Sequence, residues 1–310
     1  MSTIETNTEN DTETLHKAMK GPGKNKEVIV KLVANRTVRQ RMSIKEYYKI
    51  AYGGDIIKDL EKGLSGNFSN AVIALFTNPI EYDCIQLRKA MKGAGSDKES
   101  LIELIVTRPN WMIKSIVQEY SNYIKRDLIK DVESETSGPL QKILLAFLQG
   151  NKGENLQPSL EECTQLAQSL IDAEPKNWWT ENSVLIPILT TKSPIEIALI
   201  CREYHKLAKK TILESIEKEV QKKDGKNYLK LILFALISPS EYFAKRLNQS
   251  VKGIGTDDNL LIRILVTRDE IDMPQIKQYY KQIIKKDMLE DIKGDTSGDY
   301  RKLLIELADH

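Results

Sequence analysis

The heptapeptide MKGAGSD (Met91–Asp97) is followed 160 residues later (251 − 91) by a close copy, VKGIGTD (Val251–Asp257). An acidic residue stands 44 residues after the start of each copy, Glu135 in one (135 − 91) and Asp295 in the other (295 − 251). Hard cations such as calcium prefer carbonyl and carboxylate oxygens. The duplicated pattern therefore predicts two calcium sites, each made of a glycine loop and a remote carboxylate.

The sequence contains four copies of a repeat to which these two segments belong. A glycine opens an apolar segment in each of them, with spacings of 72, 87 and 73 residues: Gly66, Gly138, Gly225 and Gly298. The additional residues between copies two and three are rich in Gly and Asn and indicate a linker. The predicted boundaries are 1–11 for a polar tail, 12–78 for repeat 1, 79–149 for repeat 2, 150–158 for the linker, 159–238 for repeat 3 and 239–310 for repeat 4.

Apolar residues within each copy recur with the period of a helix, as in the run that includes Leu101, Ile102 and Ile105. Period-two alternation between hairpin turns, the pattern of strands, does not occur. We therefore predict an all-α fold of four homologous repeats with about five short helices each, stacked so that neighbours bury one another's apolar faces. Ser96, followed by Glu99, matches a capping box and predicts a helix start; Thr256 is the candidate cap in copy four.

Charge and cysteine content narrow the function classes. The 46 Lys and Arg nearly balance the 44 Asp and Glu, so overall charge does not indicate a nucleic-acid partner. Cys84, Cys163 and Cys201 lack metal-site spacing, which favours reduced thiols in a reducing compartment. The beginning of the chain resembles no signal or transit peptide, and the longest apolar run, Leu231–Ile237, is too short to span a bilayer. These features predict a cytoplasmic protein that meets membranes only peripherally.

The glycine loops, the Val-Thr-Arg segments at 106–108 and 266–268, and the Asp/Glu-Thr-Ser-Gly tetrapeptides together resemble the annexin family over nearly the whole chain. The short tail and the two divergent copies are more similar to protist members such as the α-giardins. The resemblance implies a curved disc of four five-helix repeats that binds Ca²⁺ and, through it, the anionic phospholipid on the inner face of membranes.

The resemblance also implies the calcium ligands of copies two and four. They are the carbonyl oxygens of three loop residues and one carboxylate in each copy: Met91, Gly93, Gly95 and Glu135 in copy two, and Val251, Gly253, Gly255 and Asp295 in copy four. Thr256 and Asp258 are candidates for a secondary site beside the fourth loop. Lys98 takes the place of Asp258 in copy two, which argues against a secondary site there.

Copies one and three depart from this pattern. Copy one keeps its glycines, but Gly63 stands at the position of the acid, so we expect no calcium ligand set there and consider Lys20 and Lys24 for direct contact with phosphate. Copy three has Glu174 to Thr180 in place of the glycine loop, and Lys222 or a neighbour in place of the acid, so we expect that site to be lost.

Tryptophan suits a lipid interface because it is apolar with one polar N–H. Trp178, in the loop of copy three, is therefore a candidate for membrane contact, and burial in the core is the equally weighted alternative. Trp111 is expected to pack inside the protein.

Catalysis has little support in the sequence. His16, His205 and His310 show no triad or metal spacing, and we predict that the protein is not an enzyme. The alternative to a calcium-dependent membrane binder is a scaffold that links membranes to cytoskeletal filaments through Lys-rich faces, with calcium as a minor input. The sequence makes no prediction of oligomeric state.

Overall fold

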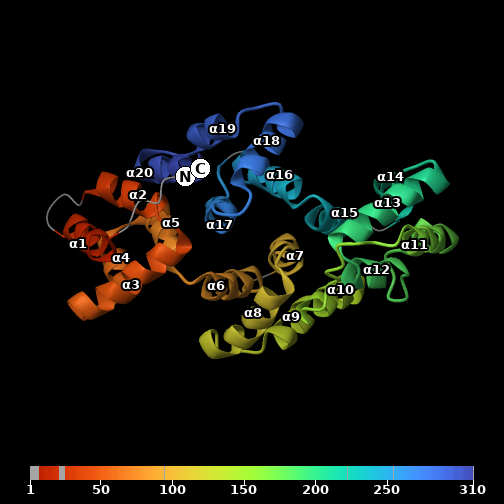
Figure 1. The fold of residues 1–310 in the computed structure, drawn as a ribbon, viewed down its shortest axis with the longest axis horizontal. Coiled ribbons are helices and arrows are strands. Elements are labelled where there is room, and N and C mark those ends of the chain that lie inside the picture. Colours follow the sequence, from red (N-terminus) through yellow and green to blue (C-terminus); the bar gives the residue numbers. More distant parts are fainter. Residues whose placement is uncertain (1–6, 21–24, 94, 222, 254, 310) are drawn as a thin grey trace. The chain divides into compact units, whose positions relative to one another are not determined.

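The computed structural model describes residues 7–20, 25–93, 95–221, 223–253 and 255–309 (Figure 1). Within these residues the chain forms twenty α-helices and one short 3-10 turn, and no β-strand. The helices divide into four consecutive groups of five. The predicted all-α fold of four five-helix repeats is confirmed.

The first two groups comprise α1 to α10. Repeat 1 contains α1 (Thr8–Met19), α2 (Lys26–Ala34), α3 (Val38–Tyr52), α4 (Ile56–Gly63) and α5 (Gly66–Phe76). Repeat 2 contains α6 (Pro79–Ala90), α7 (Lys98–Val106), α8 (Asn110–Tyr123), α9 (Leu128–Glu135) and α10 (Gly138–Leu148). Helix α1 begins inside the segment predicted as a tail, because Asn7 caps it by accepting a hydrogen bond from the backbone N–H of Asn10 at 3.1 Å.

The last two groups comprise α11 to α20. Repeat 3 contains α11 (Leu160–Asp172), the 3-10 turn η1 (Pro175–Asn177), α12 (Leu185–Thr191), α13 (Pro194–Ala208), α14 (Ile212–Glu219) and α15 (Lys223–Ile237). Repeat 4 contains α16 (Pro239–Val251), α17 (Asp258–Arg268), α18 (Met273–Ile284), α19 (Met288–Asp295) and α20 (Gly298–Ala308). No helix lies between Leu148 and Leu160, where the linker is predicted.

The repeats combine into two compact units. Unit 1 joins Met1–Pro79 to Phe243–His310, and unit 2 is Ile80–Tyr242. Within unit 1, α2 packs beside α20 and α5 beside α17, although these helices are far apart in sequence (Figure 1). Within unit 2, α7 packs against α15 in the same way. Each repeat therefore buries its apolar faces partly against a different repeat.

The predicted apolar stripes form the core. Leu101, Ile102 and Ile105 of α7 and Ile113 and Ile116 of α8 are all buried. Complete burial of such a side chain contributes about 1.5–3 kcal/mol to stability. The helical period of the sequence thus identifies the inward face of these helices correctly.

An arginine ties the end of the second helix to the first helix in two repeats, and it is buried in repeat 2 and half-buried in repeat 1. Arg108 donates two hydrogen bonds to the carboxylate of Asp83, at 2.7 and 2.8 Å, and Arg36 does the same to Asp11, at 2.6 and 2.8 Å. Repeat 4 has Phe243 at this position, and the guanidinium of Arg268 stacks on its ring at 4.4 Å. The arginines of the Val-Thr-Arg segments noted in the sequence therefore link the first two helices within each of these repeats.

Candidate metal centre

The loops of repeats 2 and 4 have matching backbones. Gly93 and Gly95 have φ angles of 118° and 104°, and Gly253 and Gly255 have φ angles of 118° and 85°. L-residues with a side chain rarely adopt this region, so the glycines are required by the turn itself. All four glycines are exposed to solvent, which leaves the loops accessible to a ligand.

Each loop is closed by the residue that also starts the following helix. The backbone N–H of Asp97 donates to the carbonyl of Ala90 at 2.8 Å, and that of Asp257 donates to Ser250 at the same distance. The Asp97 and Asp257 carboxylates then cap α7 and α17. The prediction that Ser96 and Thr256 are the caps is therefore wrong by one residue.

The hydroxyls of Ser96 and Thr256 instead reach the remote acids. Ser96 Oγ donates to the carboxylate of Glu135, and Thr256 Oγ1 contacts Asp295 at its carbonyl oxygen (3.0 Å) and at Oδ2 (3.3 Å). Glu135 is the last residue of α9 and Asp295 is the last residue of α19. The structure thus brings each acid to the loop with which the sequence paired it, although 39 residues separate hydroxyl and acid in both repeats.

A tyrosine–aspartate hydrogen bond in the first turn of the helix helps to position the acid at its last residue. Tyr120 donates to Asp131 at 2.8 Å in repeat 2, and Tyr280 donates to Asp291 at 2.7 Å in repeat 4. Burial, followed by this hydrogen bond, raises the pKa of both tyrosines. A third helix is thereby tied to the fourth, which carries the acid.

Asp131 has a second partner. Arg126 donates to both of its carboxylate oxygens, at 2.8 Å to Oδ2 and 2.5 Å to Oδ1, and these hydrogen bonds lower the pKa of Asp131 below its usual value. The aspartate therefore stays ionised over the whole physiological range and keeps α9 in place.

The two loops differ in the charge of the first residue of the helix that follows each of them. Lys98 Nζ donates to the backbone carbonyl of Glu135 in repeat 2. Asp258 occupies the corresponding first position of α17, and its Oδ2 accepts a hydrogen bond from Asn67 of α5. The carboxylate considered for a secondary site is thus already engaged by Asn67.

These loops fit calcium in the chemistry of their donors. No group of three His, Cys, Asp or Glu side chains gathers anywhere in the described ranges. The donors available at each loop are carbonyl oxygens and one carboxylate, the hard oxygen ligands that calcium prefers and zinc does not.

The loop of repeat 1 lies mostly outside the described residues, which include Lys20 but not 21–24, so the prediction for Lys24 falls there. Its flanks resemble the other loops, since the N–H of Asn25 donates to the carbonyl of Ala18 at 3.1 Å and the Asn25 side chain caps α2. Helix α4 ends at Gly63, where α9 and α19 end in an acid. Lys20 is exposed.

In repeat 3 a packed turn and a buried tryptophan stand where repeats 2 and 4 have the glycine loop. The turn η1 replaces the loop and packs against α14. The side chain of Trp178 is 0% exposed, its indole N–H donates to the carbonyl of Leu170 at 3.3 Å, and its ring packs edge-on against Tyr204. The prediction that Trp178 contacts a membrane is therefore wrong, and the buried alternative is correct.

Repeat 3 has an acid at the end of its fourth helix, where Lys222 or a neighbour was expected. Helix α14 ends at Glu219, as α9 ends at Glu135, so Glu219 stands at the acid position, and Lys222 lies outside the described residues. Its carboxylate pairs with Lys210. Gly225 lies inside α15 rather than at its start, and a Cβ there would approach Trp179 Cδ1 to 2.5 Å. The repeat thus keeps an acid but uses it, and its glycine, for packing.

Trp111 is exposed, whereas it was predicted to be buried. It lies in the first turn of α8 and its side chain is 66% exposed, so the expectation that it packs inside is wrong. The described chain contains no helix with the length and apolar character required to cross a membrane.

Comparison with known proteins places these features in a family. The family model named Annexin matches four segments of the chain, 10–75, 82–147, 165–223 and 242–307. Human annexin A7 is 42% identical over 300 residues, which are 96% of this chain and 61% of annexin A7, so the chain spans about three fifths of that relative's length.

Solved structures give the same result. The structure of annexin III is 34% identical and superposes with a TM-score of 0.94, covering 100% of this chain and 96% of that one. Calcium-bound annexin (Sm)1 is 30% identical with a TM-score of 0.89, over 100% and 92% of the two chains. Calcium-bound alpha-14 giardin, at 21% identity and a TM-score of 0.81 over 97% and 99%, shares the fold. Annexins are generally calcium-dependent phospholipid-binding proteins, and by its four repeats, its sequence and its fold this chain belongs to the annexin family.

Proposed function

We propose that this protein binds anionic phospholipid surfaces through calcium ions held by the loops of repeats 2 and 4. The proposed ligands are the carbonyls of three residues in each loop and the carboxylate of Glu135 or Asp295. The observation that carries the proposal is the matched hydroxyl-to-acid contact, which brings the carboxylate to an exposed glycine loop in both repeats.

The number of oxygens explains why a lipid is part of the site. Three carbonyls and a bidentate carboxylate supply five oxygens, whereas calcium takes roughly 6–8. One carboxylate also leaves a bound Ca²⁺ with a local charge of about +1, which favours an anionic oxygen as an additional ligand. A phosphate of a lipid headgroup provides both the oxygen and the charge.

The same reasoning predicts how calcium and lipid depend on each other. A site with a single carboxylate should bind calcium weakly in the absence of lipid, at dissociation constants of about 10⁻⁴–10⁻³ M. Because coupling between two ligands is reciprocal, calcium must strengthen lipid binding by the same factor as lipid strengthens calcium binding. Two loops that engage one membrane together add avidity.

The proposed location follows from this chemistry. The protein would act peripherally on the cytoplasmic face of a membrane, in agreement with its three free cysteines. No catalytic step forms part of the proposal.

Sedimentation with phosphatidylserine-containing vesicles tests the proposal. We expect binding in calcium and release in chelator, and loss of binding at moderate calcium in the double variant Glu135→Gln plus Asp295→Asn. The matched control is Glu133→Gln plus Glu290→Gln, which removes the same charge from exposed positions of α9 and α19. Binding that ignores calcium, or an equal loss in both double variants, contradicts the proposal.

A further inference from the structure

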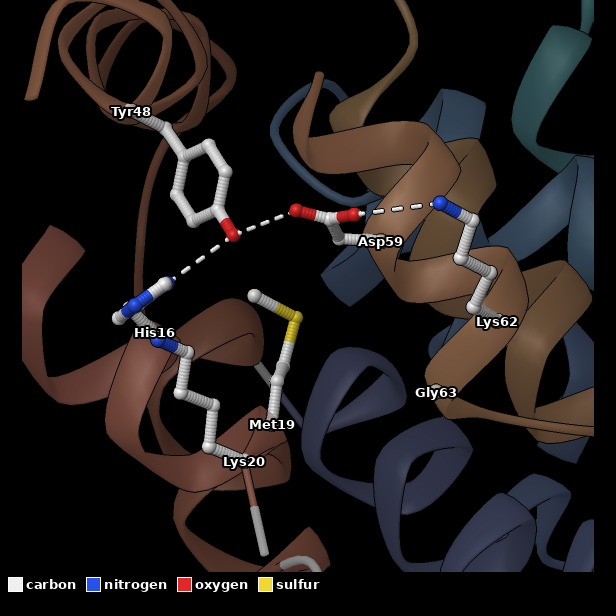
Figure 2. Close-up of a pocket in the computed structure, with 7 residues that line it drawn as sticks. All are labelled: His16, Met19, Lys20, Tyr48, Asp59, Lys62 and Gly63. Atoms are coloured by element: carbon white, nitrogen blue, oxygen red, sulfur yellow. Dashed lines mark hydrogen bonds and ion pairs between the residues drawn. The ribbon is translucent and has the colours of Figure 1, made fainter. Parts of the chain in front are cut away.

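A cavity of about 270 Å³ opens in repeat 1 at the place where repeats 2 and 4 have their acids. Its walls come from α1, α3 and α4, and its polar lining consists of His16, Lys20, Tyr48, Asp59 and Lys62 (Figure 2). Gly63, at the end of α4, lines the cavity as well. The loss of the acid at this position therefore leaves an accessible space rather than a filled one.

A hydrogen-bonded chain fixes the inner wall of the cavity. Tyr48 donates its hydroxyl proton to Asp59 at 2.9 Å, so its oxygen can only accept from His16 Nδ1, which lies 3.0 Å away (Figure 2). The His16 ring also stacks on Tyr52, with centroids 3.6 Å apart and planes 9° apart. The imidazole is thus held with its proton on Nδ1. Its other nitrogen, Nε2, takes no part in the hydrogen bonds between His16, Tyr48 and Asp59.

A Tyr–Asp hydrogen bond occurs in repeats 1, 2 and 4, whereas in repeat 3 Tyr204 bonds Ser215. Tyr120 and Asp131 form the same bond in repeat 2, but there Arg88 stands beside the aspartate, with Nη1 3.5 Å from it. In repeat 4 the third group is Asn248, 3.4 Å from the Tyr280 hydroxyl. Among the described residues, only repeat 1 places a titratable imidazole beside an acid position that carries no acid.

Positive charge dominates the cavity. Lys20 caps the end of α1, four residues after His16, and extends toward its ring, and Lys62 lies on α4 on the other side (Figure 2). The single carboxylate, Asp59, is engaged by Tyr48 and lies 4.0 Å from Lys62 Nζ. Two ammonium groups face one carboxylate that already has partners.

The titratable groups facing His16 are Lys20 on its own helix, Tyr48 and Tyr52 on α3, and Asp59 and Lys62 on α4. Burial, followed by the charge of Lys20, lowers the pKa of His16, and Asp59 opposes this change. A bound anion would reverse the effect of Lys20 and favour the protonated imidazole.

We propose that this cavity binds a phosphate group directly and without calcium, with Lys20 and Lys62 as the charged contacts and His16 as a donor when protonated. Repeat 1 would then bind phosphate through lysine side chains, whereas repeats 2 and 4 would bind it through a calcium ion. The phosphate is either a free anion or part of a lipid headgroup, and only the lipid case rests on the proposed membrane function.

The test uses the full chain in chelator, so the calcium loops do not contribute. The ring signals of His16 are followed by NMR over pH with and without inorganic phosphate, and His16→Gln identifies them among the three histidines. We expect saturable binding that raises the pKa of His16, and about tenfold weaker binding in Lys20→Gln plus Lys62→Gln. The control is Lys17→Gln plus Lys31→Gln, two exposed lysines of the same repeat that pair with Glu13 and Glu27.

A second measurement distinguishes the source of the phosphate. Vesicles of phosphatidic acid and phosphatidylcholine are sedimented with the protein in chelator. Binding that is lost in Lys20→Gln plus Lys62→Gln and kept in the control identifies a lipid headgroup, whereas phosphate binding without vesicle binding identifies the free anion. The proposal is overturned if phosphate leaves the His16 titration unchanged or if the control variant loses binding equally. Neither result affects the calcium-dependent binding assigned to the other repeats.

Discussion

The hydroxyl of Ser96 donates a hydrogen bond to the carboxylate of Glu135, which links the second-repeat loop to the end of α9. Thr256 and Asp295 form the same contact in repeat 4. A glycine loop is intrinsically adaptable, so a carboxylate that is already oriented reduces the entropy lost when an ion binds. The contact is therefore expected to matter for affinity rather than for folding.

Removal of this hydroxyl tests that expectation. In Ser96→Ala the calcium concentration for half-maximal vesicle binding should rise about threefold, because a hydrogen bond contributes about 0.5–1.5 kcal/mol. The control is Ser115→Ala, whose hydroxyl donates only to the carbonyl of Trp111 in its own helix. Equal calcium requirements in Ser96→Ala and the unaltered protein would show that the contact does not orient the acid.

The charge beside each loop should set the order of calcium affinity. Lys98 bonds the Glu135 carbonyl, whereas repeat 4 has Asp258 at that position, so we expect the fourth-repeat loop to bind calcium more tightly. Lys98→Gln should strengthen the second-repeat site about fivefold, since one charge several ångströms away at an intermediate dielectric is equivalent to about 1 kcal/mol. Calorimetry in the Asp295→Asn background isolates this site, and Lys130→Gln on α9 is the control; a weaker site in Lys98→Gln would refute the argument.

The lowered pKa of Asp131 predicts a pH-dependent contribution to stability. A carboxylate with a depressed pKa stabilises the fold above its unfolded value, about 3.8, and the contribution disappears as pH falls through the folded value. Arg126→Gln should therefore reduce the free energy of unfolding at pH 7, by a small amount because Arg126 is half-exposed and solvent screens the pair. Urea unfolding between pH 7 and pH 2 should show the difference from the unaltered protein shrinking below pH 4; a constant difference would assign the effect to packing.

The two tryptophans of opposite burial form a matched pair. Trp178→Ala should lower the free energy of unfolding by about 3–5 kcal/mol, because it leaves a large cavity and an unpaired Leu170 carbonyl. Trp111→Ala should change it by less than about 0.5 kcal/mol, because its side chain is mostly in solvent. Denaturant unfolding of both variants measures this, and similar losses in the two would contradict the assigned burial.

The sequence predicts the fold well because its signal is distributed over many residues. The apolar stripes of four copies repeat one period, and each stripe is buried, so single exceptions such as Trp111 do not change the assignment. Positions at which two neighbouring residues could play the same role are predicted less well. Ser96 and Asp97 are both good caps, and the structure uses Asp97 because Ser96 turns toward an acid 39 residues away.

The candidate site is predicted where the loop and the acid keep a fixed spacing. Repeat 3 has no glycine loop from which such a spacing can be counted, and the register that identifies Glu219 is visible only from the end of α14. The burial of Trp178 likewise depends on Leu170 and Tyr204, which the loop sequence does not reveal. The role of His16 is not visible in any motif spacing either, since the Tyr48 and Tyr52 side chains that hold it come from another helix.

Crystals soaked in calcium test the central claim most directly. We predict anomalous density at two places, beside Glu135 with the carbonyls of Met91, Gly93 and Gly95, and beside Asp295 with those of Val251, Gly253 and Gly255. Water or an added phosphate should complete each shell of about 6–8 oxygens. Density at the Pro175–Asn177 turn of repeat 3, or a calcium ion bound without either acid, would contradict the account.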